Sequence, residues 1–331
     1  PRPVKWFNIS RVCRYERSQK GRLREFFQWN CDILGVPDVT GDAECLAVAA
    51  DALREFGLTP DDVEIRLSSR KLLAGLLARL GLAAEVVPQV YAVLDKRGKV
   101  PADVLEKMLD ELQLSAEQRA GLDAIFTYAS LDAIPADVAA DPAVSGPLGE
   151  LRELFDLTSA TGAADFIRFD ISIVRGLAYY TGPVWEVFDK RGELRSLFGG
   201  GRYDNLIAAT GGQPMAACGF GAGDVTMSLL LDALGRWPDG GSRVEYMVLY
   251  ADEGQIREAA RVTQQLRSVG KSAQYALNAA ALKRQLKMAA DCGSPWAVIV
   301  GAEGCPAGSV RLRDMKTGQE RDLPIEDLLK S

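Results

Sequence analysis

The amino-acid sequence predicts an α/β protein: an α+β domain with an antiparallel sheet and helices, a helical insertion, and a C-terminal α/β domain. Three observations support this fold class. Apolar and polar residues alternate with period two in residues 3–35 and 165–207, as in strands with one buried face. The part between them has a mostly helical pattern. Beyond a Pro-Asp-Gly-Gly-Ser linker at 238–242, short apolar runs alternate with helical segments.

The length of the chain and these changes of pattern predict the domain boundaries. A chain of 331 residues is long enough for two or three domains of ordinary size. We expect residues 1–74 and 151–237 to form one domain, residues 75–150 to form a helical insertion in it, and residues 243–331 to form a compact α/β domain.

The first element is expected to be a β-hairpin over residues 3–35, with a polar tip at 17–22. One face of the hairpin is apolar and is expected to pack on a core. This face comprises Phe7, Ile9, Cys13, Tyr15, Phe27, Trp29, Cys31 and Ile33. The opposite face collects Arg14, Glu16, Gln28, Asn30 and Asp32. So many polar and charged groups on one sheet face indicate a binding site.

Helices and glycine-rich strands are expected in the rest of these two domains. A helix is expected over 42–56, because its apolar pattern stops at Gly57. Further helices are expected at 72–80, 104–112, 117–128 and 224–234, and strands at 167–173 and 184–188. The glycines at 199–201 and 219–223 indicate close approach of a ligand or another strand, although turn formation explains such glycines equally well.

The C-terminal domain is expected to alternate strands and helices. Strands are expected at 244–251, 273–277 and 296–301, with helices at 256–269 and 280–290. A hairpin of 310–315 with 320–323 turns at Lys316-Thr317-Gly318. This domain carries 13 cations and 11 acids, a net charge of +2, which is too mild for a strong nucleic-acid footprint.

The composition excludes several kinds of catalysis. The chain has no histidine, which excludes Ser-His-Asp and Cys-His pairs, histidine-bearing zinc sites and histidine proton shuttles. The six cysteines form no C-x-x-C pair, so reduced thiols in a cytoplasmic protein are expected. No apolar run approaches the roughly 20 residues of a membrane span, and no signal peptide is visible.

Positive charge is concentrated at the start of the chain. The net charge of the whole chain is −6, whereas residues 1–24 contain eight cations and one acid. Such a cluster often faces phosphates, although a solvated basic edge would give the same pattern.

Four segments, in this order along the chain, resemble histidyl-tRNA synthetase, a class II aminoacyl-tRNA synthetase. Residues 14–26 resemble the motif 2 strand–loop–strand of the family, and residues 175–180 (RGLAYY) resemble its histidine-binding motif. Residues 199–204 (GGGRYD) resemble the strand beside the amino-acid pocket, and the domain after 243 resembles the anticodon-binding domain. The resemblance implies a cytoplasmic, homodimeric ligase that uses histidine, ATP and tRNA(His).

The resemblance also implies residues that hold ATP. Arg14 and Arg175 would be catalytic and hold the α-phosphate from two sides, while Glu16 and the motif 2 loop would hold the adenine. Mg²⁺ would sit on the phosphates, without a metal site in the protein. Adenylation builds negative charge on phosphoryl oxygens, and the permanently charged fork of arginine stabilises such charge without a histidine base.

For the amino acid, the resemblance implies a pocket on the polar face of the hairpin and in the RGLAYY segment. Gln28 would take the α-amino group of histidine. Asp32 and Tyr180 would hold the two imidazole nitrogens, with Tyr179 lining the pocket and Arg175 contacting the same substrate.

The sequence departs from the family pattern in three places. Thr226 stands where motif 3 of the family has an arginine against ATP, so Arg22 or Arg202 is expected to supply that positive charge. Ala178 replaces a usual acid. The N-terminal part with motif 1 is missing, and the start at Pro1 favours a fragment.

Two other interpretations remain open. One is a non-catalytic histidine sensor that resembles the regulatory subunit of ATP phosphoribosyltransferase, or an RNA-binding regulator; Thr226 favours this class. Arg14, Gln28, Arg175 and Tyr180 favour the enzyme. The other interpretation is a synthetase for another amino acid, which the RGLAYY motif disfavours.

Overall fold

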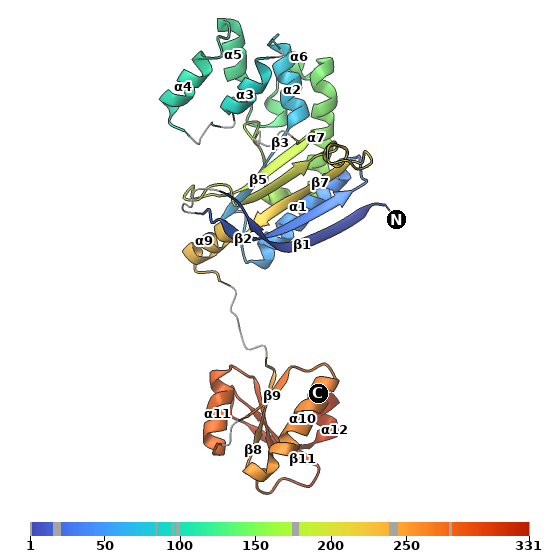
Figure 1. Ribbon diagram of the computed structural model, residues 1–331, viewed down its shortest axis with the longest axis vertical. Coiled ribbons are helices and arrows are strands. Elements are labelled where there is room, and N and C mark those ends of the chain that lie inside the picture. The colour runs from blue at the N-terminus through green and yellow to red at the C-terminus, as the bar shows by residue number, and fades with distance from the viewer. Residues whose placement is uncertain are drawn as a thin grey trace. The chain divides into compact units, whose positions relative to one another are not determined.

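The computed structural model describes residues 2–15, 21–83, 85–94, 96, 100–173, 179–237, 244–277 and 280–330. The chain divides into two compact units, Pro1–Trp237 and Pro238–Ser331 (Figure 1). Each unit has its own sheet and its own hydrophobic core. The fold class predicted from the sequence, an antiparallel-dominated α/β protein, is confirmed.

The first unit is built on a seven-stranded sheet with the order β1-β2-β7-β6-β5-β3-β4. All neighbouring strands in it are antiparallel except β3 and β4. The strands are β1 Val4–Cys13, β2 Glu25–Leu34, β3 Val63–Ser69, β4 Ile167–Phe169, β5 Pro183–Asp189, β6 Phe198–Arg202 and β7 Ala217–Gly223.

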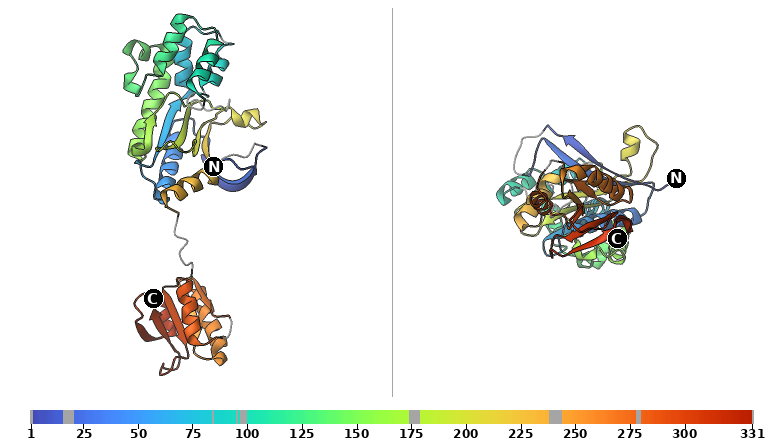
Figure 2. Two further views of the ribbon diagram at one scale, coloured as in Figure 1. Left: turned by 90° about the vertical axis from the view of Figure 1, so that its left-hand side faces the viewer. Right: turned by 90° about the horizontal axis from the view of Figure 1, so that it is seen from below.

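Helices cover one face of this sheet. Helix α1 (Thr40–Glu55) packs on β2 and β7, and α7 (Pro142–Ala160) packs on β3 and against α1 (Figure 2). Helix α9 (Asp224–Leu234) packs on β2. Fully buried side chains of this layer include Leu46, Leu53, Ile65, Leu67 and Trp185. The opposite face of the central strands is therefore available for a site.

Short helices gather at one end of the first unit (Figure 1). They are α2 Arg70–Arg79, α3 Val87–Leu94, α4 Ala102–Asp110, α5 Ala116–Ile125 and α6 Ala136–Ala139, with 3-10 turns at Leu131–Ala133 and Ala164–Phe166. Local signals explain several of their ends. Ser115 and Gln118 form a capping box at α5, and Asp141 accepts a hydrogen bond from Ala143 N at the start of α7. The short helix α8 (Leu206–Ala209) follows β6.

The hairpin forms as predicted, but its first arm is not packed on a core. Phe7 is 69% exposed and Ile9 is 66% exposed, whereas Ile33 on the second arm is buried. The cause is topological: β1 is the edge strand of the sheet, and α1 packs mainly against β2 and β7. The prediction of a buried apolar face is therefore wrong for β1 and holds for part of β2.

The second unit has a five-stranded sheet with the order β12-β11-β10-β8-β9. Its strands β10, β8 and β9 are parallel, and β11 and β12 extend the sheet as antiparallel strands. The elements are β8 Tyr246–Tyr250, a 3-10 turn at Glu253–Gln255, α10 Ile256–Ser268, β9 Ala273–Tyr275, α11 Leu282–Asp291, β10 Trp296–Val300, β11 Ser309–Asp314, β12 Glu320–Pro324 and α12 Ile325–Lys330.

No helix in the described parts of either unit is both long and apolar enough to cross a membrane.

Candidate active site

The floor of the candidate site is backbone. Gly219 of β7 lies in register with Asp32 of β2 and Gly201 of β6, and Gly221 lies in register with Asn30 and Gly199. A Cβ atom on Gly219 would lie 2.4 Å from the Tyr203 hydroxyl oxygen and 2.8 Å from Asp32 Oδ1. These glycines are therefore required by the close approach of neighbouring side chains, and the turn explanation for them does not hold in β6 and β7.

Asp32 lies at the centre of an aromatic cluster. The Tyr203 hydroxyl donates a hydrogen bond to Asp32 Oδ1, and Trp6 Nε1 donates to Asp32 Oδ2 at 3.2 Å. The rings of Tyr179 and Tyr180 have centroids 4.7 Å apart, and Tyr179 lies edge-on to Tyr203 at 6.0 Å. Burial and the bond to Asp32 raise the pKa of Tyr203, which keeps its hydroxyl a donor.

This cluster brings together three of the residues predicted to hold the amino acid, namely Asp32, Tyr179 and Tyr180. A carboxylate among aromatic rings can accept a hydrogen bond from a flat N–H heterocycle and stack on it. Tyr203 is a member that sequence reasoning missed. The signal for it was its position in the GGGRYD segment, directly after strand β6.

A chain of hydrogen bonds links the polar side chains of the hairpin. Arg14 Nη2 donates to Gln28 Oε1 at 3.0 Å, and the amide nitrogen of Gln28 donates to Asn30 Oδ1. Asn30 Nδ2 in turn donates to Asn8 Oδ1 at 3.0 Å. The guanidinium of Arg14 also lies 5.0 Å from the centroid of the Phe26 ring. The predicted residues Arg14 and Gln28 are thus held together, with their polar ends on one face.

A cavity of about 770 Å³ opens beside Arg14 and Gln28. Arg22, another predicted ATP-binding residue, also lines it. Sequence reasoning missed several further lining residues, among them Phe26, Arg66, Glu186 and Arg195. Arg66 is engaged within the protein, because its Nε donates to Glu64 Oε1 at 2.6 Å and its guanidinium lies over the Phe188 ring. The cavity is large enough for a nucleotide and is rich in arginine, which suits a polyphosphate.

Arg202 does not reach this cavity. Arg202 lies on the helix side of the sheet and is only 2% exposed. Its guanidinium forms an ion pair with Asp42, which is 1% exposed. The same guanidinium donates to the carbonyl oxygens of Val36 at 2.9 Å and Asp38 at 2.7 Å, and to Asp204 Oδ1 at 3.1 Å. The prediction that Arg202 contacts ATP is therefore wrong, because its charge and its donors are used inside the fold.

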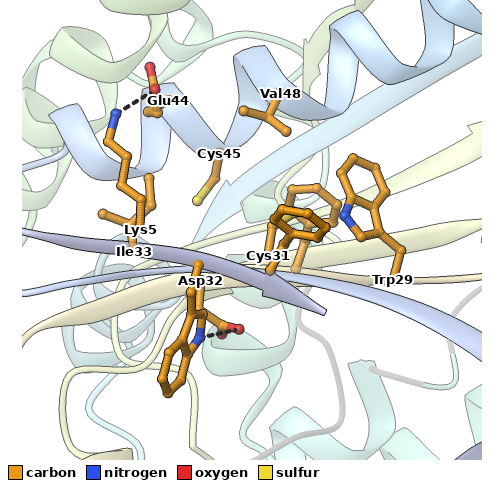
Figure 3. A pocket seen from close by; sticks show the side chains of 11 residues that line it. Lys5, Trp29, Cys31, Asp32, Ile33, Glu44, Cys45 and Val48 are labelled. Atoms are coloured by element: carbon orange, nitrogen blue, oxygen red, sulfur yellow. Dashed lines mark hydrogen bonds and ion pairs between the residues drawn. The ribbon is translucent and has the colours of Figure 1, made fainter. Parts of the chain in front are cut away.

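A smaller cavity of about 300 Å³ lies between the hairpin and α1 (Figure 3). Trp29, Cys31 and Ile33 point into it from β2, and Cys45 and Val48 point into it from α1. Asp32 also belongs to its lining, as does the ion pair of Lys5 with Glu44 at 2.6 Å. Figure 3 shows the Asp32 carboxylate on the other side of the strands, and Trp6 Nε1 donates to this carboxylate. We assign the site to the larger cavity, because the convergent polar groups lie on that face.

Thr226 lies in the first turn of α9 and lines the larger cavity. It is 3% exposed, and its hydroxyl donates to the Leu197 carbonyl oxygen at 2.7 Å. It thus offers no charge to a ligand. Glu16, Arg175 and Ala178 lie outside the described residues, so the roles predicted for Glu16 and Arg175 stay predictions. In the described part of the chain, no three cysteine, aspartate or glutamate residues form a group that could hold a metal ion.

The first unit thus combines an antiparallel-dominated sheet, helices on one face, and a polar, arginine-lined cavity over glycine strands on the other. The sequence profile described as Histidyl-tRNA synthetase matches residues 1–225, and the profile described as Anticodon binding domain matches residues 245–331. The chain belongs to the histidyl-tRNA synthetase family.

Individual relatives agree with this assignment. The chain is 37% identical to the chloroplastic/mitochondrial histidine–tRNA ligase of Arabidopsis thaliana over 98% of its own length and 66% of that protein. It is 39% identical to the histidine–tRNA ligase of Opitutus terrae over 99% of its length and 76% of that protein. Its fold matches the crystal structure of histidyl-tRNA synthetase from Nostoc with a TM-score of 0.83 at 22% identity, over the whole chain and 78% of that chain.

A second structural neighbour bears on the alternative interpretation. It is an ATP phosphoribosyltransferase regulatory subunit/histidyl-tRNA synthetase from Bacillus halodurans, with a TM-score of 0.63 at 22% identity over 83% of this chain. At this identity the likeness concerns the fold alone. The curated relatives from Arabidopsis thaliana, Opitutus terrae and Halobacterium salinarum, which match nearly the whole chain, are histidine–tRNA ligases.

Proposed function

We propose that this protein activates histidine with ATP to histidyl-adenylate and transfers the histidyl group to the 3′ end of tRNA(His). The observation that carries the proposal is the Asp32 carboxylate, held by the Tyr203 hydroxyl and Trp6 Nε1 among aromatic rings. It lies on the same strand face as Gln28 and the arginine-lined cavity. Because strand residues rise by about 3.3 Å, Gln28 and Asp32 are about 13 Å apart along β2, which suits one amino acid placed beside a nucleotide.

In this proposal the imidazole of histidine lies at the aromatic cluster. Asp32 accepts a hydrogen bond from one imidazole N–H, and Tyr180 holds the other nitrogen, with Tyr179 against the ring. Gln28 binds the α-amino group. The family resemblance supports these roles and that of Arg175 on the same substrate. The cluster around Asp32 and Tyr203 supports the place proposed for the imidazole.

The nucleotide occupies the arginine-lined cavity. The substrate carboxylate attacks the α-phosphate of ATP, pyrophosphate leaves, and negative charge builds on the phosphoryl oxygens. Arg14 stabilises this charge from one side and Arg175 from the other, while Glu16 and Arg22 hold the remainder of ATP. Phe26, beside the Arg14 guanidinium, offers a ring on which the adenine can stack. Mg²⁺ enters as part of the MgATP substrate.

The domain roles follow the same family assignment. We propose that residues 1–74 and 151–237 are the catalytic domain, that 75–150 are an insertion, and that 243–331 bind the anticodon of tRNA(His). We also propose a cytoplasmic location, which the six free cysteines support. A homodimer is supported by the exposed apolar side chains of the edge strand, among them Trp6, Phe7 and Ile9.

The experiment that tests the activity is ATP–pyrophosphate exchange, measured on the longest reading frame that contains this chain. Exchange that requires histidine, and that no other amino acid supports, is the expected result. Histidine binding without exchange would contradict the enzyme and favour the sensor alternative. Exchange with a different amino acid would contradict the assignment of the Asp32 cluster.

A further inference from the structure

Helix α9 lines one wall of the arginine-lined cavity with the uncharged residues Val225 and Thr226. The Thr226 side chain is short and buried, and its hydroxyl is committed to the Leu197 carbonyl oxygen at 2.7 Å. The triphosphate of ATP carries several negative charges in a small volume, and cationic donors around it supply most of the binding and rate enhancement in phosphoryl transfer. The arginines that line the cavity from other elements are therefore the candidates for contact with the phosphates.

Arg195 occupies this wall. It lies in the segment between β5 and β6, lines the cavity, and its Nη2 donates to the Gly21 carbonyl oxygen at 2.7 Å. The two atoms nearest to a Cβ built on Gly21 are Thr226 Cγ2 at 3.3 Å and Arg195 Nε at 3.6 Å. The Arg195 guanidinium and the Thr226 methyl group therefore meet at the same glycine, where the motif 2-like segment passes α9.

The arginines that line the cavity have different partners within the protein. Arg14 lies on the β2 side, bonded to Gln28, and Arg66 is paired with Glu64 inside the sheet. Arg195 Nη2 donates to the Gly21 carbonyl oxygen, and this bond orients the guanidinium beside the cavity. A guanidinium has five N–H donors in a planar fork, and this geometry matches two phosphate oxygens at once.

We propose that Arg195 binds the phosphates of ATP and supplies, from the β5–β6 segment, the positive charge that Thr226 does not supply from α9. The proposal rests on the proposed function and names a residue for its nucleotide site. Arg195 acts on the phosphates and makes no contact with histidine.

The test uses the full chain with Arg195→Ala and Arg195→Lys, and Lys190→Ala as the matched control. Lys190 lies in the same segment, is exposed, and donates to the Pro60 carbonyl oxygen away from the cavity. Isothermal titration with MgATP and with adenosine separates the phosphate contact from the base contact. Exchange kinetics then give KM for ATP and for histidine separately, and thermal unfolding reports the fold.

Arg195→Ala is expected to weaken MgATP binding about 10- to 100-fold, the worth of a hydrogen bond to a charged group. Adenosine binding, KM for histidine and the thermal midpoint should match those of Lys190→Ala. Arg195→Lys should fall between, because it keeps the charge and loses the fork. In an Arg195→Ala background, Thr226→Arg should restore part of the lost MgATP affinity if that double variant folds.

Unchanged MgATP affinity in Arg195→Ala would overturn the proposal. An equal loss of adenosine and MgATP affinity would also overturn it, because Arg195 would then only hold the Gly21 segment in place. A parent chain that binds MgATP but shows no histidine-dependent exchange would contradict the proposed function and not the role of Arg195, since binding is measured directly.

Discussion

Replacement of Arg202 by methionine is expected to destabilise the first unit and to leave ATP binding intact in the folded protein. The Arg202 guanidinium makes two hydrogen bonds to Asp42 Oδ2, at 2.9 and 2.5 Å, and further bonds to Asp204 and to two backbone carbonyls. Removing one partner of a buried ion pair costs about 3–5 kcal/mol of unfolding free energy. This is a large share of the roughly 5–15 kcal/mol that stabilises an ordinary domain.

The assay is urea denaturation of the full chain, followed by tryptophan fluorescence. Of the five tryptophans only Trp296 lies in the second unit, so a Trp296→Phe background reports the first unit. Burial raises the pKa of Asp42 to about 6 against the opposing effect of Arg202, so the measurement is made at pH 8. Without Arg202 that pKa rises further. Protonation of Asp42 then relieves part of the cost, which should be smaller at pH 5 than at pH 8.

A double-mutant cycle with Asp42→Asn separates the ion pair from the other contacts of Arg202. We expect a coupling free energy of about 1–3 kcal/mol between the two positions. Wild-type stability in Arg202→Met, together with a raised KM for ATP, would refute the reasoning and restore Arg202 as an ATP-binding residue.

Three further predictions concern other parts of the first unit. Tyr203→Phe removes the hydroxyl that holds Asp32 and should raise KM for histidine about tenfold with little change in KM for ATP; a selective effect on ATP in exchange kinetics would contradict it. Gly221→Ala places a Cβ 2.7 Å from a glutamine amide of the site, so activity should fall at least tenfold while the thermal midpoint stays near that of the parent; full activity would show that the floor tolerates side chains. Burial raises the pKa of Asp62, but hydrogen bonds from Thr59 and Arg236 outweigh burial and lower it. Arg236→Ala should therefore reduce the free energy of unfolding at pH 7, and its difference from the parent should shrink as the pH falls below about 4. Urea midpoints measured against pH would test this.

Much of the fold was predictable from local patterns. The period-two alternation predicted β2 and the glycine after residue 56 predicted the end of α1, because both signals act within a few residues. Strand β3 (Val63–Ser69) was not predicted, although its sequence carries the same signal: Val63, Ile65 and Leu67 alternate with polar residues. The exposure of the apolar side chains of β1 was not predicted, because it depends on the order of the strands in the sheet, which no local sequence pattern contains.

The polar face of the hairpin was predictable from local alternation. Gln28 and Asp32 lie on one face of β2, and Arg14 at the end of the other arm bonds to Gln28, while their roles stay predictions. Tyr203 and Arg195 were missed because they reach the site from segments distant in sequence. Arg202 was misassigned, since a positive charge beside glycines suggests a ligand, and only the structure reveals Asp42 on the helix side.

The backbone floor of the site has a consequence for inhibitor resistance. A compound that contacts the peptide groups of Gly201 and Gly219 would contact atoms common to every amino acid. A substitution there can only add a side chain, and a Cβ on Gly201 would lie 2.6 Å from the Pro183 carbonyl oxygen. Resistance through these positions would therefore damage the enzyme itself, so compounds anchored on the floor should select escape variants on the walls.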